Sequence, residues 1–197
     1  MPSRASKPKT RLRFEPLTPA RWADLVGLFG PERGAYFGCW CMFWRVTRAE
    51  FEKLGKTGRK AAFRKLVRAG KPPGILAYDG GKPVGWCAIA PRAATPTLDR
   101  SPICKPVDDQ PVWSITCFYI DPTARRQGIM SELIEAATVH AKRHGATTLE
   151  AYPRDGQGGK VSEMSAYIGV LKPFIDNGFE MVARRKPSRP VVRRQIM

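Results

Sequence analysis

One stretch of the sequence decides the fold, and it reads VWSITCFYI at residues 112–120 and DPTARRQGIMS at residues 121–131. The first part is rich in β-branched and aromatic residues, so we expect a strand. The second part is a turn with Pro122 and Gly128, followed by an apolar helical pattern over residues 128–144. The first N–H groups of a helix have no intrahelical partner and carry the positive end of its dipole. A basic turn between a strand and a helix therefore predicts a binding site for an anion.

The turn itself suits a phosphate group. Gly128 allows a pyrophosphate to approach the backbone closely, and Arg125 and Arg126 add positive charge. The Gly-Lys-Ser/Thr pattern of Walker-type loops is absent, and the turn holds only one glycine, so the dinucleotide fingerprint is absent as well. The sequence predicts a phosphate-bearing ligand that neither of these nucleotide schemes holds.

Periodicity predicts regular elements on both sides of this unit. Before it we expect a strand over residues 11–16, a helix from Thr18-Pro19 to Gly30-Pro31, a helix over 48–69 interrupted near Gly55 and Gly58, a hairpin of 75–78 and 83–90, and a Pro-rich loop over 91–111. After the helix, which is capped by Gly145, we expect a strand over 147–152, a mobile Gly-rich segment over 153–162, a helix over 165–177 and two strands from Phe179. This order predicts an α/β fold with a mixed sheet.

The composition fits a single domain with unevenly distributed charge. The chain has 197 residues, of which 43% are hydrophobic, and its formal net charge is +17. We expect one domain over residues 11–197 and a disordered basic arm over residues 1–10. Most of the positive charge lies in residues 1–13, 45–72 and 180–197. A charge run is usually a solvated face, so nucleic acid is not the favoured partner.

Targeting and redox signals favour the cytoplasm. The first residues are polar and basic with no apolar stretch behind them, so no secretory signal is predicted. The longest apolar runs, such as residues 39–44, are too short to span a bilayer, so no membrane association is expected. Five cysteines at irregular spacing suit a reducing compartment better than a disulfide scaffold.

Several of these features together resemble the GNAT superfamily of N-acetyltransferases. The turn reads Arg125-x-x-Gly128-x-Met130, similar to that family's Arg/Gln-x-x-Gly-x-Gly/Ala signature between its fourth strand and third helix. The stretches FYIDP at 118–122, HGA at 144–146 and NGF at 177–179 are similar as well. The resemblance covers nearly the whole chain and implies a GNAT-like mixed sheet of about six to seven strands flanked by about four helices.

The resemblance also implies a donor and a mechanism. Acetyl-CoA is the acyl donor in that family, and the acceptor amine attacks its thioester directly. The pantetheine arm would pair with the backbone of Phe118, Tyr119 and Ile120 like an added strand. The pyrophosphate would bind the turn and the helix start, at Arg125, Arg126, Gln127, Gly128, Ile129, Met130 and Ser131.

Three positions depart from the family pattern. Met130 stands where a second small residue is usual, which predicts crowding near the phosphates. Ser114 stands near the position of a catalytic Glu in some members, and we expect its hydroxyl to hold a water that relays the proton. Phe174 stands where a Tyr often serves as the acid, so Tyr167 is the predicted acid and Tyr152 is the alternative.

The missing carboxylate favours a small-molecule acceptor over a protein lysine. A free lysine amine has a pKa of about 10.4, and neutralising it near pH 7.4 costs about 4 kcal/mol. An amine of lower pKa is an easier substrate without a strong base. The remaining acids near the ends of the fourth and fifth strands are expected to hold a cationic acceptor such as an aminoglycoside, and they are Asp108, Asp109, Glu150, Asp155 and Glu163.

Residues 39–44 read CWCMFW and have two interpretations. They form an aromatic core patch beside the substrate groove, or they form a wall of the acceptor pocket in which Trp40 contacts a cation or a sugar with its face. Trp113 has the same two interpretations. Zinc is not favoured, because the cysteines form no CxxC pair. Cys117 is expected to be a small buried hydrophobe rather than an acyl-enzyme nucleophile, and His140 a satisfied core residue.

The sequence as a whole predicts an N-acetyltransferase that moves acetyl from acetyl-CoA to a primary amine of a small molecule, without a metal. The expected catalytic residues are Ser114 and Tyr167, and the expected acceptor contacts are Trp40, Trp113, Asp108, Asp109, Glu150 and Tyr152. If the acceptor is an aminoglycoside-type antibiotic, the function is antibiotic resistance. Two alternatives stay open, a protein or peptide N-acetyltransferase and a non-catalytic nucleic-acid-binding protein of the same fold. The basic C-terminal strand at a possible dimer edge adds a homodimer to the expectations.

Overall fold

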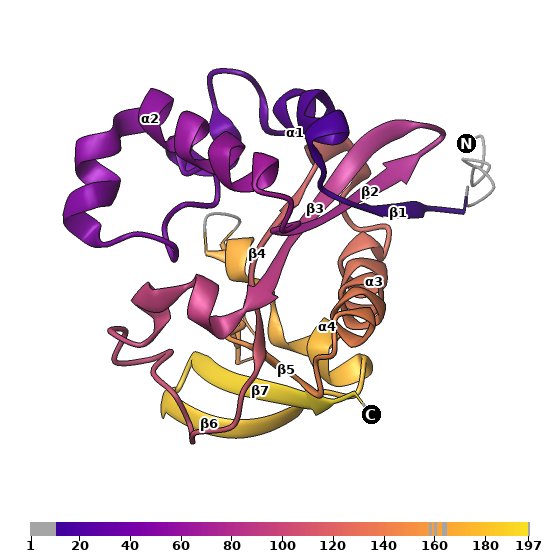
Figure 1. Ribbon diagram of the computed structural model, residues 1–197. Helices are drawn as coiled ribbons and strands as arrows, with labels where there is room; N and C mark the ends of the chain where they lie inside the picture. The colour runs from indigo at the N-terminus through magenta and orange to yellow at the C-terminus, as the bar shows by residue number, and fades with distance from the viewer. Residues whose placement is uncertain (1–10, 158, 160, 163–164, 197) are drawn as a thin grey trace.

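The computed structural model describes residues 11–157, 159, 161–162 and 165–196, and its centre is a seven-stranded mixed sheet (Figure 1). The strand order is β1-β2-β3-β4-β5-β7-β6, and only the β4–β5 pair is parallel. The strands are β1 (Arg13–Pro16), β2 (Gly74–Asp79), β3 (Lys82–Pro91), β4 (Trp113–Ile120), β5 (Thr148–Ala151), β6 (Glu180–Lys186) and β7 (Arg189–Gln195). The α-helices are α1 (Trp22–Phe29), α2 (Arg48–Arg68), α3 (Ile129–Arg143) and α4 (Leu171–Asp176). This confirms the predicted α/β fold with a mixed sheet.

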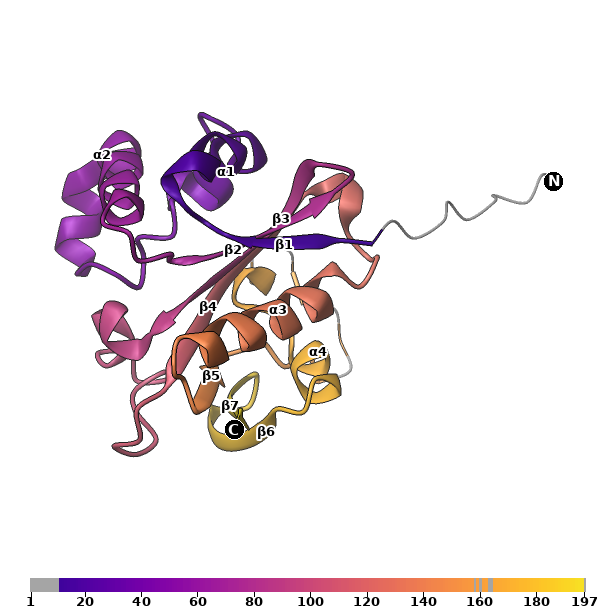
Figure 2. The ribbon, with the colours of Figure 1, turned by 45° about the vertical axis from the view of Figure 1, so that its right-hand side comes forward.

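Helices cover both faces of the sheet, and each face has its own core. Figure 2 shows α1 and α2 on one side of the central strands and α3 and α4 on the other. Leu25, Phe29 and Phe63 bury the first face. Leu133 and Phe174 bury the second. Both patterns follow from the apolar stripes of the helices, because an amphipathic helix is stable only when that stripe is covered.

The parallel pairing of β4 with β5 is short, and it ends at a bulge. The register joins Trp113 to Leu149 and Ile115 to Ala151, and it stops there. On the other side of β4, Ala88 pairs with Cys117 and Ile89 pairs with Ile115, so Thr116 is an extra residue. A bulge twists its strand away from its neighbour. The two strands therefore separate from Thr116 onward, and a gap opens in the middle of the sheet.

Local signals explain where α2 begins and where it breaks. Thr47 and Glu50 form a reciprocal capping box at its first turn. Gly55 has φ 57° and interrupts the helix, as predicted. Gly58 continues it, so the second predicted interruption is wrong. Thr18 also differs from its prediction, because its side chain makes no capping hydrogen bond.

The predicted helix over 165–177 is two elements rather than one. A short 3-10 turn, η6 (Ala166–Ile168), precedes α4, and Gly169 lies between them with φ 88°. A side chain at this position would lie 2.6 Å from the terminal carbon of Met130 and 3.2 Å from the Phe118 ring. Gly169 thus lets the chain pass closely over β4 and α3.

His140 is buried on α3, but it is not satisfied as expected. Its ring lies 6.0 Å from that of Trp113 and 4.3 Å from that of His144. Its Nε2 atom is buried and has no hydrogen-bond partner among the described residues. Burial, with smaller contributions from His144 and Arg143, lowers the pKa of His140 to about 4.

Replacing Gly169 by Ala is expected to destabilise the fold by about 2–4 kcal/mol, since a strained φ and a steric clash act together. Gly145→Ala is the matched control, because Gly145 has φ 80° but a side chain added there would meet no described atom within 4 Å. Urea unfolding of both variants separates backbone strain from packing. If both variants lose the same unfolding free energy, the steric clash at Gly169 adds nothing to the cost of the backbone strain.

Stability is expected to fall with acidification because His140 is held neutral in the folded state. Its folded pKa of about 4 lies below the unfolded value, so the stabilisation is complete above about pH 6.5 and is lost as pH falls toward 4. The slope from this group is at most about 1.4 kcal/mol per pH unit. His140→Leu should flatten the dependence of unfolding free energy on pH between 6.5 and 4, whereas His144→Gln should keep most of it.

Candidate functional site

A cavity of about 250 Å³ lies beside the point where β4 leaves β5. Its walls are mainly aromatic and apolar, with three cysteines and one threonine among them. The lining residues are Ala35, Tyr36, Phe37, Cys39, Cys41, Phe43, Trp44, Phe51, Thr116, Cys117 and Tyr167. The bulge residue Thr116 and the turn η6 thus face the same space as the 35–44 segment. A concave apolar site with a few polar groups is the usual form of a small-molecule site.

Tyr167 is the one predicted catalytic residue that lines this cavity. Its ring lies 6.1 Å from the ring of Tyr36, another cavity residue. Burial, reinforced by Cys117, raises the pKa of Tyr167 to about 12. The phenol therefore stays protonated at neutral pH and is able to donate a proton.

Ser114 and Tyr152 are joined in a buried network instead. The Ser114 hydroxyl lies 2.9 Å from the Tyr152 hydroxyl, and Tyr152 donates to Glu150 Oε1 at 2.6 Å. Arg92 binds the same carboxylate oxygen at 2.7 Å, and Arg193 binds the other at 2.8 Å. Ser114, Glu150 and Tyr152 are at most 1% exposed. The Ser114 hydroxyl is engaged by Tyr152, and Ser114 is not among the residues that line the cavity, so its role in a water relay stays a prediction.

The acids expected to attract a cationic acceptor are mostly neutralised. Asp108 lies 2.6 Å from Arg193, which lowers the pKa of the Asp108 carboxyl. Asp155 pairs with Arg184 at 2.8 Å. Asp109 is exposed and does not line the cavity. Of the predicted acids, Glu163 lies outside the described residues.

The two tryptophans expected at the acceptor site lie in the cores. Trp40 is 1% exposed and stacks on Trp22 with ring centres 6.0 Å apart, whereas its neighbours Cys39 and Cys41 line the cavity. Trp113 packs against His140 on the opposite face of the sheet. Each of the two interpretations of residues 39–44 holds for part of the segment. Trp40 belongs to the core patch, and Cys39, Cys41, Phe43 and Trp44 form a wall of the cavity.

The predicted phosphate turn has the geometry of an anion site. Arg126 and Gly128 are exposed and have φ values of 62° and 84°, and α3 begins immediately after them. Backbone reversals of this kind point N–H groups into a shared concavity. Arg125 Nε donates to the Ile120 carbonyl at 3.2 Å, which holds this arginine against the end of β4.

The rest of the turn is braced by neighbouring elements. The Gln127 amide donates to the Thr123 carbonyl at 3.4 Å, and the Ser131 hydroxyl accepts from Asn177 at 2.6 Å. Ile129 is buried in the core. The end of the Met130 side chain lies next to Gly169, between η6 and α4, and the expected crowding near the phosphates stays a prediction.

The backbone edge of β4 that faces β5 is open in the half of the strand next to this turn. Beyond Ile115, no described strand pairs with it on the β5 side. Phe118 and Ile120 point into the α3 core, and Tyr119 packs against Phe29 and Tyr36 on the α1 side. Their side chains are thus occupied, while the backbone edge lies along the gap in the sheet.

The family to which the chain belongs follows from comparison with known sequences. A sequence model described as the acetyltransferase (GNAT) family matches residues 40–157, which is more than half of the chain. The chain belongs to the GNAT acetyltransferase family. GNAT enzymes use acetyl-CoA as the donor, so this chain is an acetyl-CoA-dependent N-acetyltransferase. No curated protein sequence matches it.

Solved structures agree with this fold at low sequence identity. An N-acetyltransferase from Staphylococcus aureus Mu50 has a TM-score of 0.54 and 14% identity, over 95% of this chain and 100% of the other. The paiA N-acetyltransferase from Thermoplasma acidophilum in complex with coenzyme A has a TM-score of 0.52 and 11% identity, over 94% and 99%. Aminoglycoside N-acetyltransferase AAC(6')-Iy in complex with CoA has a TM-score of 0.54 and 15% identity, over 91% and 95%.

The described residues of this GNAT chain give two further findings. They contain no helix long and apolar enough to cross a membrane. They also contain no group of three or more His, Cys, Asp or Glu side chains arranged to hold a metal ion.

Sequence reasoning missed several residues of this GNAT site. Thr116 was overlooked because a bulge cannot be read from the strand pattern. Arg92 and Arg193 were overlooked because they meet Glu150 from positions 58 and 43 residues away in the chain. Cys41 and Cys117 both line the cavity, and their only signal in the sequence is that they are cysteines in otherwise aromatic segments.

Glu150→Gln is expected to lower the unfolding free energy by about 3–5 kcal/mol, because it leaves two arginines next to a neutral amide in a buried site. Asp109→Asn is the matched control, since that side chain is exposed and its loss should stay within about 0.5 kcal/mol. Chemical denaturation measures both. A Glu150→Gln variant as stable as the control would contradict a stabilising role for the network.

Proposed function

We propose that this GNAT enzyme acetylates the primary amine of a small molecule that has an apolar or aromatic body. The observation that carries this is the aromatic cavity at the β4–β5 split. Aromatic walls exclude water and bury apolar surface, and ring faces attract an ammonium group. The cavity is about 250 Å³, a volume that suits a compact amine better than an extended peptide.

The donor is assigned to the open edge of β4 and to the turn that follows it. The backbone of Phe118, Tyr119 and Ile120 would receive the pantetheine arm as an added strand. The pyrophosphate would lie over the turn at Arg125, Arg126, Gln127, Gly128, Ile129, Met130 and Ser131. The left-handed residues Arg126 and Gly128, together with the start of α3, support this assignment.

The reaction then needs few groups from the protein. The neutral amine attacks the thioester carbonyl, and the C–S bond breaks as the amide forms. Backbone N–H groups of β4 polarise the carbonyl, and Tyr167 is the proposed donor of a proton to the leaving CoA thiolate. Binding both substrates at one split in the sheet supplies the positioning.

An aminoglycoside acceptor, and with it a role in antibiotic resistance, has less support than an aromatic amine. A polycationic sugar needs free carboxylates, and the carboxylates of Asp108, Glu150 and Asp155 are engaged by arginines. The structural likeness to an aminoglycoside acetyltransferase is a likeness of fold. A homodimer and a cytoplasmic location stay predictions.

Acetyl-CoA is expected to raise the melting temperature, and Arg126→Glu is expected to abolish the rise. At one hundred times the dissociation constant, a ligand stabilises the fold by about 2.7 kcal/mol, which corresponds to roughly 5–11 °C in a chain of this size. Arg68→Glu is the control, because it makes the same charge change on the exposed face of α2. The acceptor class is then tested by CoA release with phenethylamine and with kanamycin.

Two results would overturn the proposal. The absence of any acetyl-CoA-dependent rise would remove the donor site. CoA release with kanamycin but not with aromatic amines would remove the proposed acceptor class.

A further inference from the structure

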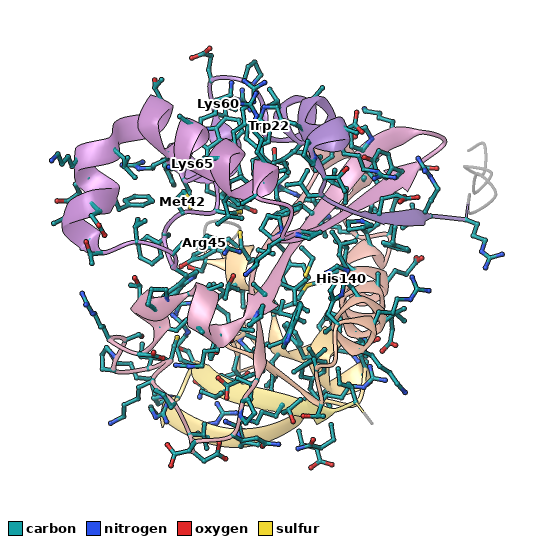
Figure 3. The ribbon with its side chains drawn as sticks, viewed as in Figure 1. Trp22, Met42, Arg45, Lys60, Lys65 and His140 are labelled. Carbon is teal, nitrogen blue, oxygen red and sulfur yellow. The ribbon has the colours of Figure 1, made fainter. Side chains whose placement is uncertain are left out.

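Three buried hydrogen-bond donors beside the acceptor cavity have no partner among the described residues. The buried side-chain nitrogen atoms without a partner are Trp44 Nε1, His140 Nε2, Arg154 Nε and Arg189 Nε. His140 belongs to α3, across the sheet from Arg45 (Figure 3). The other three atoms carry a proton and can only donate. Buried polar groups are nearly always paired, so three orphan donors in one region indicate that a ligand supplies the acceptor atoms.

Backbone hydrogen bonds hold the two arginines on neighbouring segments at the edge of the cavity. The backbone N–H of Arg154 donates to the Gly169 carbonyl at 2.9 Å, and Gly169 directly follows η6. The η6 residue Tyr167 lines the cavity. The next N–H after Arg154 donates to the Ser188 carbonyl at 3.0 Å, and Arg189 directly follows Ser188. Arg154 and Arg189 thus lie close to each other and to the turn that carries the proposed acid.

Arg189 is also tied to the other wall of the cavity. Its Nη2 atom lies 3.9 Å from Cys104 Sγ. Cys104 is fully buried in a small core cluster, and Trp44 packs against this cluster. Trp44 lines the cavity, so the Arg189 guanidinium lies one side chain away from it. The charge of Arg189 also interacts with the Tyr167 phenol, in agreement with this placement.

The positive charge of these two arginines is not balanced within the described chain. Neither of them forms an ion pair with a described carboxylate, and Asp155, the acid next to Arg154 in the sequence, binds Arg184 at 2.8 Å instead. Both guanidinium groups belong to half-buried residues. Burial lowers the pKa of Arg189, and the charge of Arg154 acts in the same direction. Two neighbouring, partly desolvated cations are costly unless an anion binds between them.

A carboxylate on the acceptor is the anion that fits this place. The planar guanidinium group binds the two oxygens of a carboxylate through parallel N–H groups. Phosphate oxygens have similar chemistry, but the proposed function assigns the phosphates of the donor to the turn at residues 125–131. The acceptor, whose body fills the cavity next to Tyr167 and Trp44, is the remaining source of negative charge. The same two cations would repel a polycationic acceptor.

We propose that Arg154 and Arg189 bind a carboxylate group of the acceptor, and that the acceptor is an amino acid with an apolar or aromatic side chain rather than a simple amine. This inference rests on the proposed function, because it names the substrate class of the same cavity. The side chain of the acceptor fills the aromatic cavity, its amine faces the thioester beside β4, and its carboxylate extends past Tyr167 to the two guanidinium groups. Both arginines determine specificity and take no part in the proton transfers.

Acetylation of L-phenylalanine is compared with that of phenethylamine, because the two acceptors differ only in the carboxylate. The wild-type kcat/KM should be about 100-fold higher with phenylalanine, as expected for one or two charge-assisted hydrogen bonds. Arg154→Gln and Arg189→Gln should each remove most of this preference through phenylalanine alone. Arg184→Gln is the matched control, because its charge is already paired with Asp155, and it should keep the preference.

Two kinetic results would contradict this assignment. Equal kcat/KM values for the two acceptors in the wild type would overturn it, although the proposed aromatic acceptor would stand. Variants of Arg154 and Arg189 that raise the KM for acetyl-CoA and leave the acceptor preference unchanged would assign these arginines to the donor.

A second measurement does not depend on turnover. In the presence of CoA, calorimetry should show that the wild type binds N-acetyl-L-phenylalanine at least about tenfold more tightly than N-acetylphenethylamine, which lacks the carboxylate. Arg189→Gln should bind the two compounds alike, and Arg189→Lys, which keeps the charge, should recover part of the difference if Arg189→Gln folds poorly. A wild-type protein that binds CoA but does not prefer N-acetyl-L-phenylalanine would overturn the inference, whereas a failure to bind CoA would fall on the proposed function.

Discussion

The parallel pairing of β4 with β5 stops after Ile115 and Ala151, and the rest of the site depends on that limit. Thr116 adds one residue to β4 without a partner on β3, and the extra twist directs the strand away from β5. The separation leaves one edge of β4 open for a donor. It also leaves a space on the α2 side that the 35–44 segment, Phe51 and η6 line. A continuous sheet would have neither the edge nor the cavity, so a local irregularity of one residue determines what the fold can bind.

Where β4 and β5 do pair, a buried carboxylate and two arginines form a network of ion pairs. Glu150 is fully buried in β5, and the guanidinium groups of Arg92 and Arg193 bind its two oxygens separately. Arg193 belongs to β7 and Arg92 to the turn after β3, so three distant segments meet at one carboxylate. A buried pair of this kind recovers little net free energy, because desolvation opposes the attraction. Its effect is on geometry, since the ion pairs tie β5 to β7 and to the turn after β3, and the Ser114–Tyr152 hydrogen bond adds β4 to the same network.

Much of the fold could be predicted from the sequence, but less of the site could. Strand and helix periods, the Gly-Gly hairpin and the basic turn at Gly128 are local signals, and the structure confirms them. The Ser114 prediction came from the family resemblance, whereas Thr116, the bulge residue two positions later, is the polar residue of β4 that lines the cavity. The carboxylates of Asp108 and Glu150 read as free acids because their arginine partners lie far along the chain. Trp40 lies in the core beside Trp22 and has a left-handed backbone that its residue type does not favour, so its position has no signal in the sequence pattern.

The charged network and the cavity lie at opposite ends of the short β4–β5 pairing, and the difference separates structure from chemistry. Around Glu150, two guanidinium groups meet a carboxylate, with Asp99 and Asp108 at the periphery, so every charge has a permanent partner. These side chains are engaged with one another and none of them lines the cavity. Beyond Thr116 the lining consists of aromatic rings, thiols and the Tyr167 phenol, so the groups that can contact an acceptor inside the cavity come from the 35–44 segment, β4 and η6 rather than from the ion pairs.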